Sequence, residues 1–297
     1  MKEGIIIKGI SGFYYVKENE NIYECKARGI LRKKKITPLV GDKVVFEVLD
    51  ESEKKGIIDE IKPRISELIR PPIANIEKVM ITFSIKEPNA NLSLVDRFIV
   101  FAEKENLNVV LVMTKVDLAD EEYVNEIKSE YENIGYKVIP VSSETGENID
   151  MVVEELKNST SVFAGQSGVG KSSILNAIDP DFNLKTAEIS QKLGRGKHTT
   201  RHAELFEVSK NAIVADTPGF SSFDVSGIEI EELKEYFIEF NNYDECRFGK
   251  KCIHRNEPEC AVKQAVEDNH ISKRRYDSYI NIMNEINNSN SKFRRNI

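Results

Sequence analysis

The hydrophobic pattern changes twice along the chain, and the first part alternates apolar and polar residues in short runs. Turn-forming residues separate these runs, which predicts strands rather than helices. Five short strands in succession favour a small β-barrel. The runs cover residues 4–8, 12–17, 22–27, 43–49 and 56–61.

This first part also carries basic and aromatic side chains. The basic loop of residues 32–35 lies between the third and fourth predicted strands, and Phe13, Tyr14, Tyr15 and Tyr23 add aromatic groups. A five-stranded barrel with these features is compatible with an OB-fold that binds nucleic acid. Core aromatics and a solvated loop explain the pattern equally well, so the barrel alone leaves its function open.

The second part begins after Pro63, Pro71 and Pro72, which mark a linker. Apolar strands and amphipathic helices then alternate, a pattern that predicts a parallel sheet covered on both faces. The predicted strands are residues 78–84, 108–113, 137–141, 161–164, 205–208 and 212–215, and the predicted helices are residues 95–105, 121–134, 148–156 and 171–178.

In the third part the strand signals stop and helical spacing takes over. Residues 231–240, 261–268 and 273–287 are predicted helices, and the Asn-, Ser- and Arg-rich end is expected to be a disordered tail. The chain is therefore predicted to be multidomain, with an N-terminal β-barrel over residues 1–65, a central α/β domain over residues 66–224 and a C-terminal helical domain over residues 225–297.

Charge follows nearly the same division. The net charge of the 297 residues is −7, but residues 1–65 carry +3, residues 66–245 carry −15 and residues 246–297 carry +5. Two basic ends around an acidic middle fit either a solvated surface or contact with a polyanion such as RNA. The sequence has no long apolar run and no cleavage site near its N-terminus, so we expect no membrane span, no signal peptide and a cytoplasmic location.

A phosphate-binding motif lies between the predicted strand 161–164 and the predicted helix 171–178. It fits G-x-x-x-x-G-K-S, and the strand, loop and helix around it are those of a P-loop. The glycines let successive backbone amides point at phosphates, Lys171 would reach the β- and γ-phosphates, and Ser172 would bind Mg²⁺. The expected phosphate-binding residues are Gly165, Gln166, Ser167, Gly168, Val169, Gly170, Lys171, Ser172 and Ser173.

A second motif, Thr114, Lys115, Val116 and Asp117, selects the base. It follows the predicted strand 108–113, at the carboxyl end of the sheet, where ligands bind. Asp117 can accept hydrogen bonds from guanine N1–H and the exocyclic amine, whereas adenine lacks both donors. The stem of Lys115 can cover the base. Thr114 stands where GTPases usually have Asn, which we expect to weaken the tether of this loop slightly without changing base recognition.

Three further segments complete a predicted GTP site with Mg²⁺. A Ser-Ser pair after the predicted strand 137–141 resembles the Ser-Ala loop whose backbone contacts guanine. In the D-T-P-G motif, the Asp can hold Mg²⁺ through water and the Gly amide can sense the γ-phosphate. One of two adjacent threonines between the P-loop and that motif would ligate Mg²⁺, and the choice stays open. These residues are Ser142 and Ser143, Asp216 and Gly219, and Thr199 or Thr200.

The order of these motifs is unusual, because the guanine motif precedes the P-loop and the D-T-P-G motif instead of following them. This order resembles that of the circularly permuted GTPases. The G-R-G-K-H-T-T segment that begins at Gly194 and the D-T-P-G-F-S-S-F segment that begins at Asp216 resemble the ribosome small subunit-dependent GTPase family, RsgA. The resemblance covers nearly the whole chain. It implies an N-terminal OB-fold, a permuted GTPase domain, a C-terminal zinc domain and a role in late maturation of the 30S ribosomal subunit.

One position after the D-T-P-G motif departs from many GTPases. Phe220 stands where they place a Gln that orients the attacking water, so we expect slow hydrolysis unless another group helps. His198 is the candidate catalytic residue for orienting water. A structural or RNA-contacting role for His198 is the open alternative.

Four potential zinc ligands follow the spacing C-x5-C-x-H-x5-C. Three thiolates and one imidazole make a closed tetrahedral site, which indicates a structural rather than a catalytic zinc ion. The family resemblance implies the same four ligands. They are Cys246, Cys252, His254 and Cys260. Cys25 lies in a predicted strand, and we expect it to pack as a small apolar residue.

We therefore expect a GTPase that converts GTP to GDP and phosphate and acts as a switch docked on RNA. Its expected partners are the 30S subunit and 16S rRNA, its cofactors are one zinc ion and Mg²⁺ with GTP, and the chain is expected to be a monomer. A translation or signalling GTPase that acts on a protein partner is the alternative. An RNA-binding protein whose nucleotide site is inert is a third hypothesis.

Overall fold

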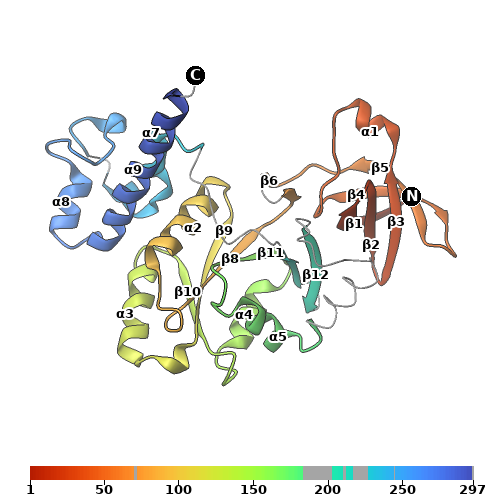
Figure 1. The fold of residues 1–297 in the computed structure, drawn as a ribbon, viewed down its shortest axis with the longest axis horizontal. Helices are drawn as coiled ribbons and strands as arrows, with labels where there is room; N and C mark the ends of the chain where they lie inside the picture. The colour runs from red at the N-terminus through yellow and green to blue at the C-terminus, as the bar shows by residue number, and fades with distance from the viewer. Residues whose placement is uncertain (70–71, 183–202, 210–211, 217–226, 244, 296–297) are drawn as a thin grey trace.

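The structure, a computed structural model, describes residues 1–69, 72–182, 203–209, 212–216, 227–243 and 245–295. Figure 1 shows three parts: the barrel with the N-terminus at one end, the C-terminal helices at the other, and an α/β sheet between them. The predicted fold class is confirmed. Within the described ranges, no helix is both long enough and apolar enough to cross a membrane.

The N-terminal barrel forms from the five predicted strands, because alternation places every second side chain inside. They are β1 (Lys2–Ile10), β2 (Phe13–Glu18), β3 (Asn21–Ala27), β4 (Lys43–Asp50) and β5 (Lys55–Ile61). The pairing of β1 with β4 closes the barrel. Tyr23 is fully buried against Phe46, so this aromatic residue is part of the barrel core. Cys25 is also buried there, as predicted.

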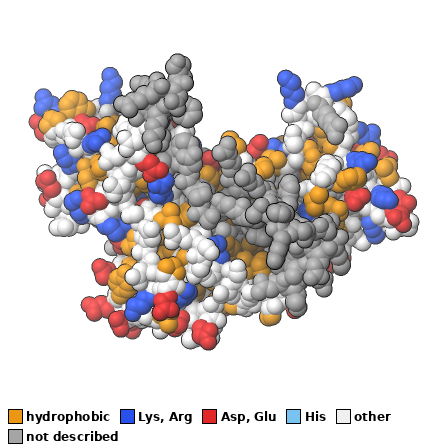
Figure 2. All heavy atoms as spheres, viewed as in Figure 1, with side chains coloured by type: hydrophobic (Ala, Val, Ile, Leu, Met, Phe, Trp, Pro, Cys, Tyr) orange, Lys and Arg blue, Asp and Glu red, His pale blue; other side chains and the backbone are white. Residues whose placement is uncertain are grey.

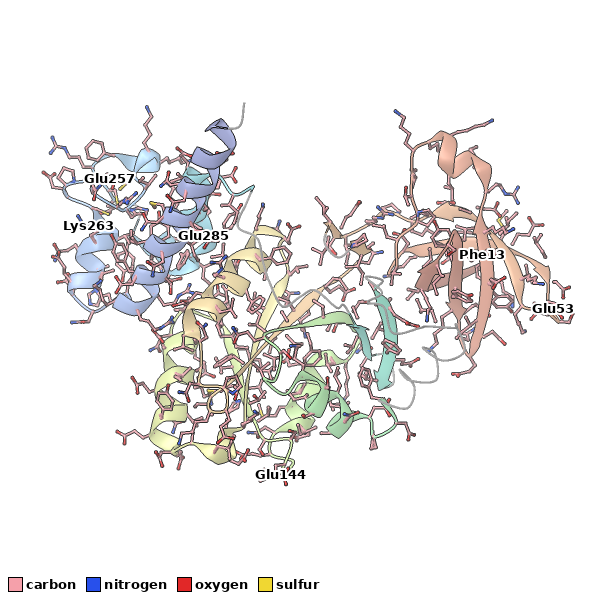
Figure 3. All side chains as sticks on the ribbon, viewed as in Figure 1. Phe13, Glu53, Glu144, Glu257, Lys263 and Glu285 are labelled. Atoms are coloured by element: carbon pink, nitrogen blue, oxygen red, sulfur yellow. The ribbon has the colours of Figure 1, made fainter. Side chains whose placement is uncertain are left out.

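The basic loop between β3 and β4 begins as a short helix, α1 (Gly29–Lys33), which the sequence pattern did not predict. Lys33, Lys34 and Lys35 are exposed, and Figure 2 shows basic side chains projecting from this end of the barrel. Phe13, which Figure 3 labels on the barrel, is half-buried, and the ammonium group of Lys26 lies 4.9 Å from its ring centroid. The barrel surface therefore offers both cationic and aromatic groups.

The proline-rich segment after β5 is folded rather than being a free linker. Two short strands of this segment, β6 (Glu67–Ile69) and β7 (Pro72–Ala74), pair as a hairpin. The side chain of Arg64 donates two hydrogen bonds, of 2.7 and 2.8 Å, to the fully buried carboxylate of Asp42 in the barrel. The predicted linker is therefore a folded connection, because backbone pairing and a buried ion pair fix the segment.

The central sheet has the strand order β10-β9-β8-β11-β13-β12. Its first five strands are parallel, as predicted, but β12 runs antiparallel to β13. The prediction of a parallel sheet is wrong at this edge, because the connection between β12 and β13 is too short for a parallel crossover. The bounds are β8 (Lys78–Ser84), β9 (Asn108–Thr114), β10 (Lys137–Val141), β11 (Ser159–Ala164), β12 (Glu204–Ser209) and β13 (Ala212–Asp216).

Helices cover both faces of this sheet. The apolar sides of α2 (Leu92–Lys104) and α3 (Glu121–Glu132) join the hydrophobic cluster that also contains the barrel core. Those of α4 (Ile149–Leu156) and α5 (Lys171–Ile178) join a second cluster on the other face. Asn91 caps α2, since its side chain accepts a hydrogen bond from the Leu94 amide at 3.2 Å.

The C-terminal part differs from its prediction in two places. The predicted helix 231–240 is divided into α7 (Ile230–Leu233) and two tighter turns, η2 (Lys234–Tyr236) and η3 (Ile238–Asn242). After η4 (Gly249–Lys251) come α8 (Ala261–Glu267) and α9 (Lys273–Arg295). The helix α9 extends through most of the segment that was expected to be a disordered tail. That segment holds few apolar residues, so the hydrophobic pattern gives no sign of a helix there.

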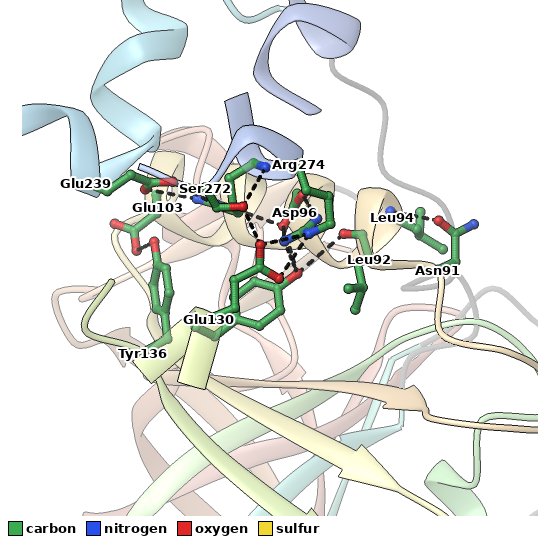
Figure 4. Close-up of polar contacts among 12 residues, drawn as sticks. Asn91, Leu92, Leu94, Asp96, Glu103, Glu130, Tyr136, Glu239, Ser272 and Arg274 are labelled. Carbon is green, nitrogen blue, oxygen red and sulfur yellow. Dashed lines mark hydrogen bonds and ion pairs between the residues drawn. The ribbon is translucent and has the colours of Figure 1, made fainter. Parts of the chain in front are cut away.

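A buried polar network joins α9 to the central domain (Figure 4). Asp96 of α2 accepts hydrogen bonds from Arg274 (2.6 Å), Arg275 (2.8 Å) and the Tyr131 hydroxyl (2.8 Å). Arg275 also forms a two-pronged ion pair with Glu239 of η3, at 2.8 and 3.0 Å. Burial alone would raise the pKa of Asp96, but the two guanidinium groups outweigh it and lower this pKa. The network fixes the helical part against α2 and α3.

Candidate functional site: a nucleotide site and a metal centre

The P-loop joins β11 to α5, as predicted, at the carboxyl edge of the sheet. Gly165, Gly168 and Gly170 have φ angles of 143°, 83° and 97°, where glycine is favoured over other residues. A Cβ atom on Gly165 would lie 2.1 Å from the carbonyl oxygen of Thr82 on β8. The backbone geometry therefore accounts for the glycines of the motif.

The charged and hydroxyl groups of the motif lie on the loop and on the first turn of α5. The Lys171 ammonium donates to the carbonyl oxygens of Gly165 (2.6 Å) and Gln166 (2.7 Å), and burial lowers its pKa. Ser167, Ser172 and Ser173 are exposed. The lysine and the helix N-terminus therefore give the loop a positive potential beside free hydroxyl groups, which suits a polyphosphate.

The guanine loop is attached directly to the P-loop. Thr114, the last residue of β9, donates a hydrogen bond of 2.6 Å from its hydroxyl to the carbonyl oxygen of Val169. The expected weakening of the tether at Thr114 is thus limited, since the threonine retains a short hydrogen bond. Lys115 has a left-handed backbone, with φ 56°, and its ammonium donates to the Glu87 carbonyl. Val116 is buried, whereas the carboxylate of Asp117 is exposed on the turn η1 (Val116–Leu118).

The Ser-Ser segment lies next to the guanine loop, because Val141 pairs with Thr114 where β10 and β9 end. Ser142 is buried, and its hydroxyl accepts a hydrogen bond of 3.2 Å from the Thr145 amide. Ser143 is exposed. The structure therefore brings the P-loop, the guanine motif and the Ser-Ser loop to one edge of the sheet.

The remaining predicted site residues lie mostly beyond the described part of the chain. Asp216 ends β13, and its backbone pairs with that of Glu204 on β12. His198, Thr199, Thr200, Gly219 and Phe220 lie outside the described residues.

Cys246, Cys252, His254 and Cys260 form a compact cluster in the helical part. All four are buried, and their candidate ligand atoms lie within 4.8 Å of one another. The Sγ atom of Cys260 is 3.8 Å from that of Cys246, 3.9 Å from that of Cys252 and 3.3 Å from His254 Nδ1. The predicted ligands therefore converge on one centre that could hold a metal ion.

Two tyrosines that the sequence did not single out support this cluster from α9. The hydroxyl of Tyr276 donates to the His254 carbonyl at 2.7 Å, and that of Tyr279 donates to the Ile253 carbonyl at 2.6 Å. They lie three positions apart within the predicted helix 273–287, and no motif in the sequence marks them. These bonds fix the backbone at His254, whose φ of 54° is left-handed.

Protonation in the cluster reflects its burial. Burial raises the pKa of Cys252 to about 12 and lowers the pKa of His254 to about 4. These pKa values correspond to a neutral Cys252 thiol and a neutral His254 imidazole at neutral pH. A metal ion would bind the thiolate forms and release protons.

The strand order, the P-loop and the guanine loop that precedes it in the sequence define a circularly permuted GTPase. A sequence model described as RsgA GTPase matches residues 61–226, and one described as RsgA N-terminal domain matches residues 3–58. The chain belongs to the RsgA GTPase family and is a GTP-hydrolysing enzyme.

Similar proteins cover almost the whole chain. The "Small ribosomal subunit biogenesis GTPase RsgA" of Alkaliphilus metalliredigens is 49% identical, over 96% of this chain and 98% of the relative, and that of Bacillus subtilis is 47% identical over the same shares. The crystal structure of YjeQ from Thermotoga maritima superposes with a TM-score of 0.84 at 36% identity, covering 96% of this chain and 98% of that one. The structure of YloQ, a circularly permuted GTPase, gives a TM-score of 0.80 at 42% identity, covering 97% and 96%.

Proposed function

We propose that the protein is a GTP-driven switch in late maturation of the small ribosomal subunit and that the subunit stimulates its hydrolysis. One observation carries the proposal: the P-loop and the guanine loop lie at the same edge of the sheet, joined by a hydrogen bond. The same chain also contains a barrel with basic groups on its surface. The names of its full-length relatives support the biological role. In this proposal the partners are the 30S subunit and its 16S rRNA, and the protein acts as a cytoplasmic monomer.

In the proposed GTP complex, residues 165–173 hold the phosphates and Asp117 accepts the guanine donors. Lys171 exchanges its two carbonyl partners for the β- and γ-phosphates, which is favourable because a lysine bound only to carbonyls lacks a counter-charge. The backbone after β10, at Ser142 and Ser143, contacts the base. The Gly219 amide senses the γ-phosphate.

The proposed Mg²⁺ ligands are Ser172, Thr199 or Thr200, and Asp216 through water. The exposed hydroxyl of Ser172 on the first turn of α5 fits this role. Mg²⁺ neutralises charge between the β- and γ-phosphates when bound. Comparing Thr199→Ala with Thr200→Ala by Mg²⁺ titration of GTP binding separates the two threonines, because only loss of the ligand raises the Mg²⁺ requirement.

Catalysis is proposed to depend on His198 and on the ribosome, because Phe220 cannot orient water. Single-turnover hydrolysis by His198→Ala, with and without 30S subunits, tests this assignment. We expect the stimulated rate to fall while GDP affinity stays the same. An unchanged stimulated rate would exclude a catalytic role for His198.

The metal in the cysteine cluster is proposed to be one structural zinc ion. Tetrahedral zinc with bonds of about 2.3 Å to sulfur places two sulfurs about 3.8 Å apart, and the observed Sγ–Sγ separations of 3.8 and 3.9 Å fit this geometry. Four protein ligands leave no position for a reactive water. Zinc would therefore stabilise the fold rather than take part in hydrolysis.

RNA contact is proposed for the barrel and for the C-terminal end of the helical part, because residues 1–65 carry a net charge of +3 and residues 246–297 carry +5. Permutation places the helical part directly after the D-T-P-G motif, so a change at the γ-phosphate can reach it through the chain. Binding to 30S subunits should weaken steeply as salt increases. Salt-independent binding, or binding to a protein partner in place of 30S subunits, would favour the alternative of a GTPase that acts on a protein.

A further inference from the structure

Within the described residues, strand pairing joins the barrel to the GTPase sheet at one pair of residues. Lys8 of β1 pairs with Glu204 of β12, in antiparallel register. Figure 1 shows β12 between the barrel and the rest of the central sheet. Opposite residues of an antiparallel pair lie on the same face, so their side chains can meet.

The two side chains form a buried ion pair. Lys8 Nζ lies 2.7 Å from Glu204 Oε1, and the side chains are only 5% and 10% exposed. Charges this deeply buried are costly unless they are paired, so each of them holds the other in place. A second, more exposed ion pair joins Lys17 of β2 to Glu207 of β12.

Glu204 also occupies a particular position relative to the nucleotide site. It is the residue opposite Asp216 in the β12–β13 ladder. Asp216 begins the D-T-P-G motif, so a shift of β12 at Glu204 is passed by backbone hydrogen bonds to the Mg²⁺ side of the site. The described hydrogen bonds of the P-loop and guanine loop, in contrast, stay within the GTPase domain.

We infer that Lys8, a residue of the barrel, is a positioning residue for GTP hydrolysis. Through Glu204 it fixes the strand position that aligns Asp216, so the barrel sets the catalytic rate but not the affinity for GDP. The inference rests on the proposed role of Asp216. It also gives the barrel a second role, because any partner that displaces β1 changes the Mg²⁺ side of the site.

The test is Lys8→Met in the full-length protein, with Lys8→Arg as the conservative variant. The control is Lys2→Met, which removes a lysine from the same strand whose partners, Glu18 and Tyr23, lie within the barrel. The measurements are kcat for GTP at saturating 30S subunits, the Mg²⁺ concentration for half-maximal rate, and the Kd of a fluorescent GDP analogue.

For Lys8→Met we expect kcat to fall by about tenfold and the Mg²⁺ concentration for half-maximal rate to rise, because a small displacement of Asp216 misaligns the reacting groups. The Kd for GDP should change by less than about twofold. Lys8→Arg should recover most of the rate, and Lys2→Met should match the wild type. An unchanged kcat for Lys8→Met, or a kcat and GDP affinity that fall together, would overturn the inference.

If Lys8→Met does not fold, the double variant Lys8→Met with Glu204→Met takes its place, because it removes both members of the buried ion pair. Its kcat should also be reduced, and a wild-type kcat in this variant would overturn the inference. Failure of the proposed function is a separate result: the wild type itself would then show no stimulation by 30S subunits.

Discussion

Replacing Arg275 by Met should destabilise the contact between the helical part and the GTPase domain more than any exposed substitution on α9. Arg275 is fully buried and donates three hydrogen bonds, of 2.8 Å to Asp96 and of 2.8 and 3.0 Å to Glu239. Its guanidinium also lies 4.6 Å from the centroid of the Phe237 ring. Met fills part of the volume but leaves two carboxylates without this partner.

The magnitude follows from the carboxylates that remain. Asp96 keeps Arg274 at 2.6 Å and Tyr131 at 2.8 Å, whereas Glu239 loses both hydrogen bonds to Arg275. Breaking a buried ion pair by removing one partner costs about 3–5 kcal/mol of unfolding free energy, and we expect a loss in this range. The control Lys273→Met on the same helix removes an exposed ion pair with Asp277 and should cost less than about 1 kcal/mol.

Urea unfolding followed by circular dichroism measures both variants, and hydrogen exchange in α2 shows where the loss occurs. Equal stabilities for Arg275→Met and Lys273→Met would refute the reasoning. The pH dependence gives a second check. The lowered pKa of Asp96 in the folded state means that its contribution is complete above the unfolded pKa of about 3.9 and is lost as pH falls through the folded pKa. Without Arg275 the folded pKa rises, so acid unfolding should begin at higher pH.

Three further predictions concern the two sites. Thr114→Val removes the 2.6 Å hydrogen bond to the Val169 carbonyl. Because one hydrogen bond contributes about 1 kcal/mol, GDP affinity measured by fluorescence titration should fall by about fivefold. Equal affinities for the variant and the wild type would show that this hydrogen bond has no effect on binding. Asp117→Asn should lose guanine affinity by at least about a hundredfold and gain affinity for xanthosine nucleotides, because the amide can donate to the xanthine 2-oxygen; unaltered guanine preference would contradict the assignment. Cys252→Ser should lower the zinc content measured by atomic emission and destabilise α8 and α9. The control Cys25→Ser should leave the zinc content unchanged. Full zinc content in Cys252→Ser would show that Cys252 is not a zinc ligand.

Local patterns predicted most of the fold, and they predicted that the four cysteine and histidine residues would cluster. The strands of the barrel and the central helices were predictable because alternation and helical spacing depend on neighbouring residues. The P-loop was predictable because its glycines meet a local backbone requirement, as the φ of Gly165 shows. The cysteine cluster was predictable from spacing alone.

Contacts between distant segments were not predictable in this way. The prolines at positions 71 and 72 predict a linker and give no sign of the hairpin β6–β7. Ile73 of that hairpin pairs with Val40, which lies far away in the sequence. The pairing of Lys8 with Glu204 spans 196 positions and leaves no periodic signal, apart from a lysine at the end of an apolar run in β1. The Thr114 tether depends on a side-chain direction that a sequence does not give.

The most direct test of the account is GTP turnover measured with and without 30S subunits at constant Mg²⁺ and salt. The account predicts slow turnover by the protein alone, because Phe220 replaces the water-orienting Gln, and a rise of at least about a hundredfold with 30S subunits, by analogy with partner-stimulated GTPases. The same slow rate in the presence and absence of 30S subunits would contradict it.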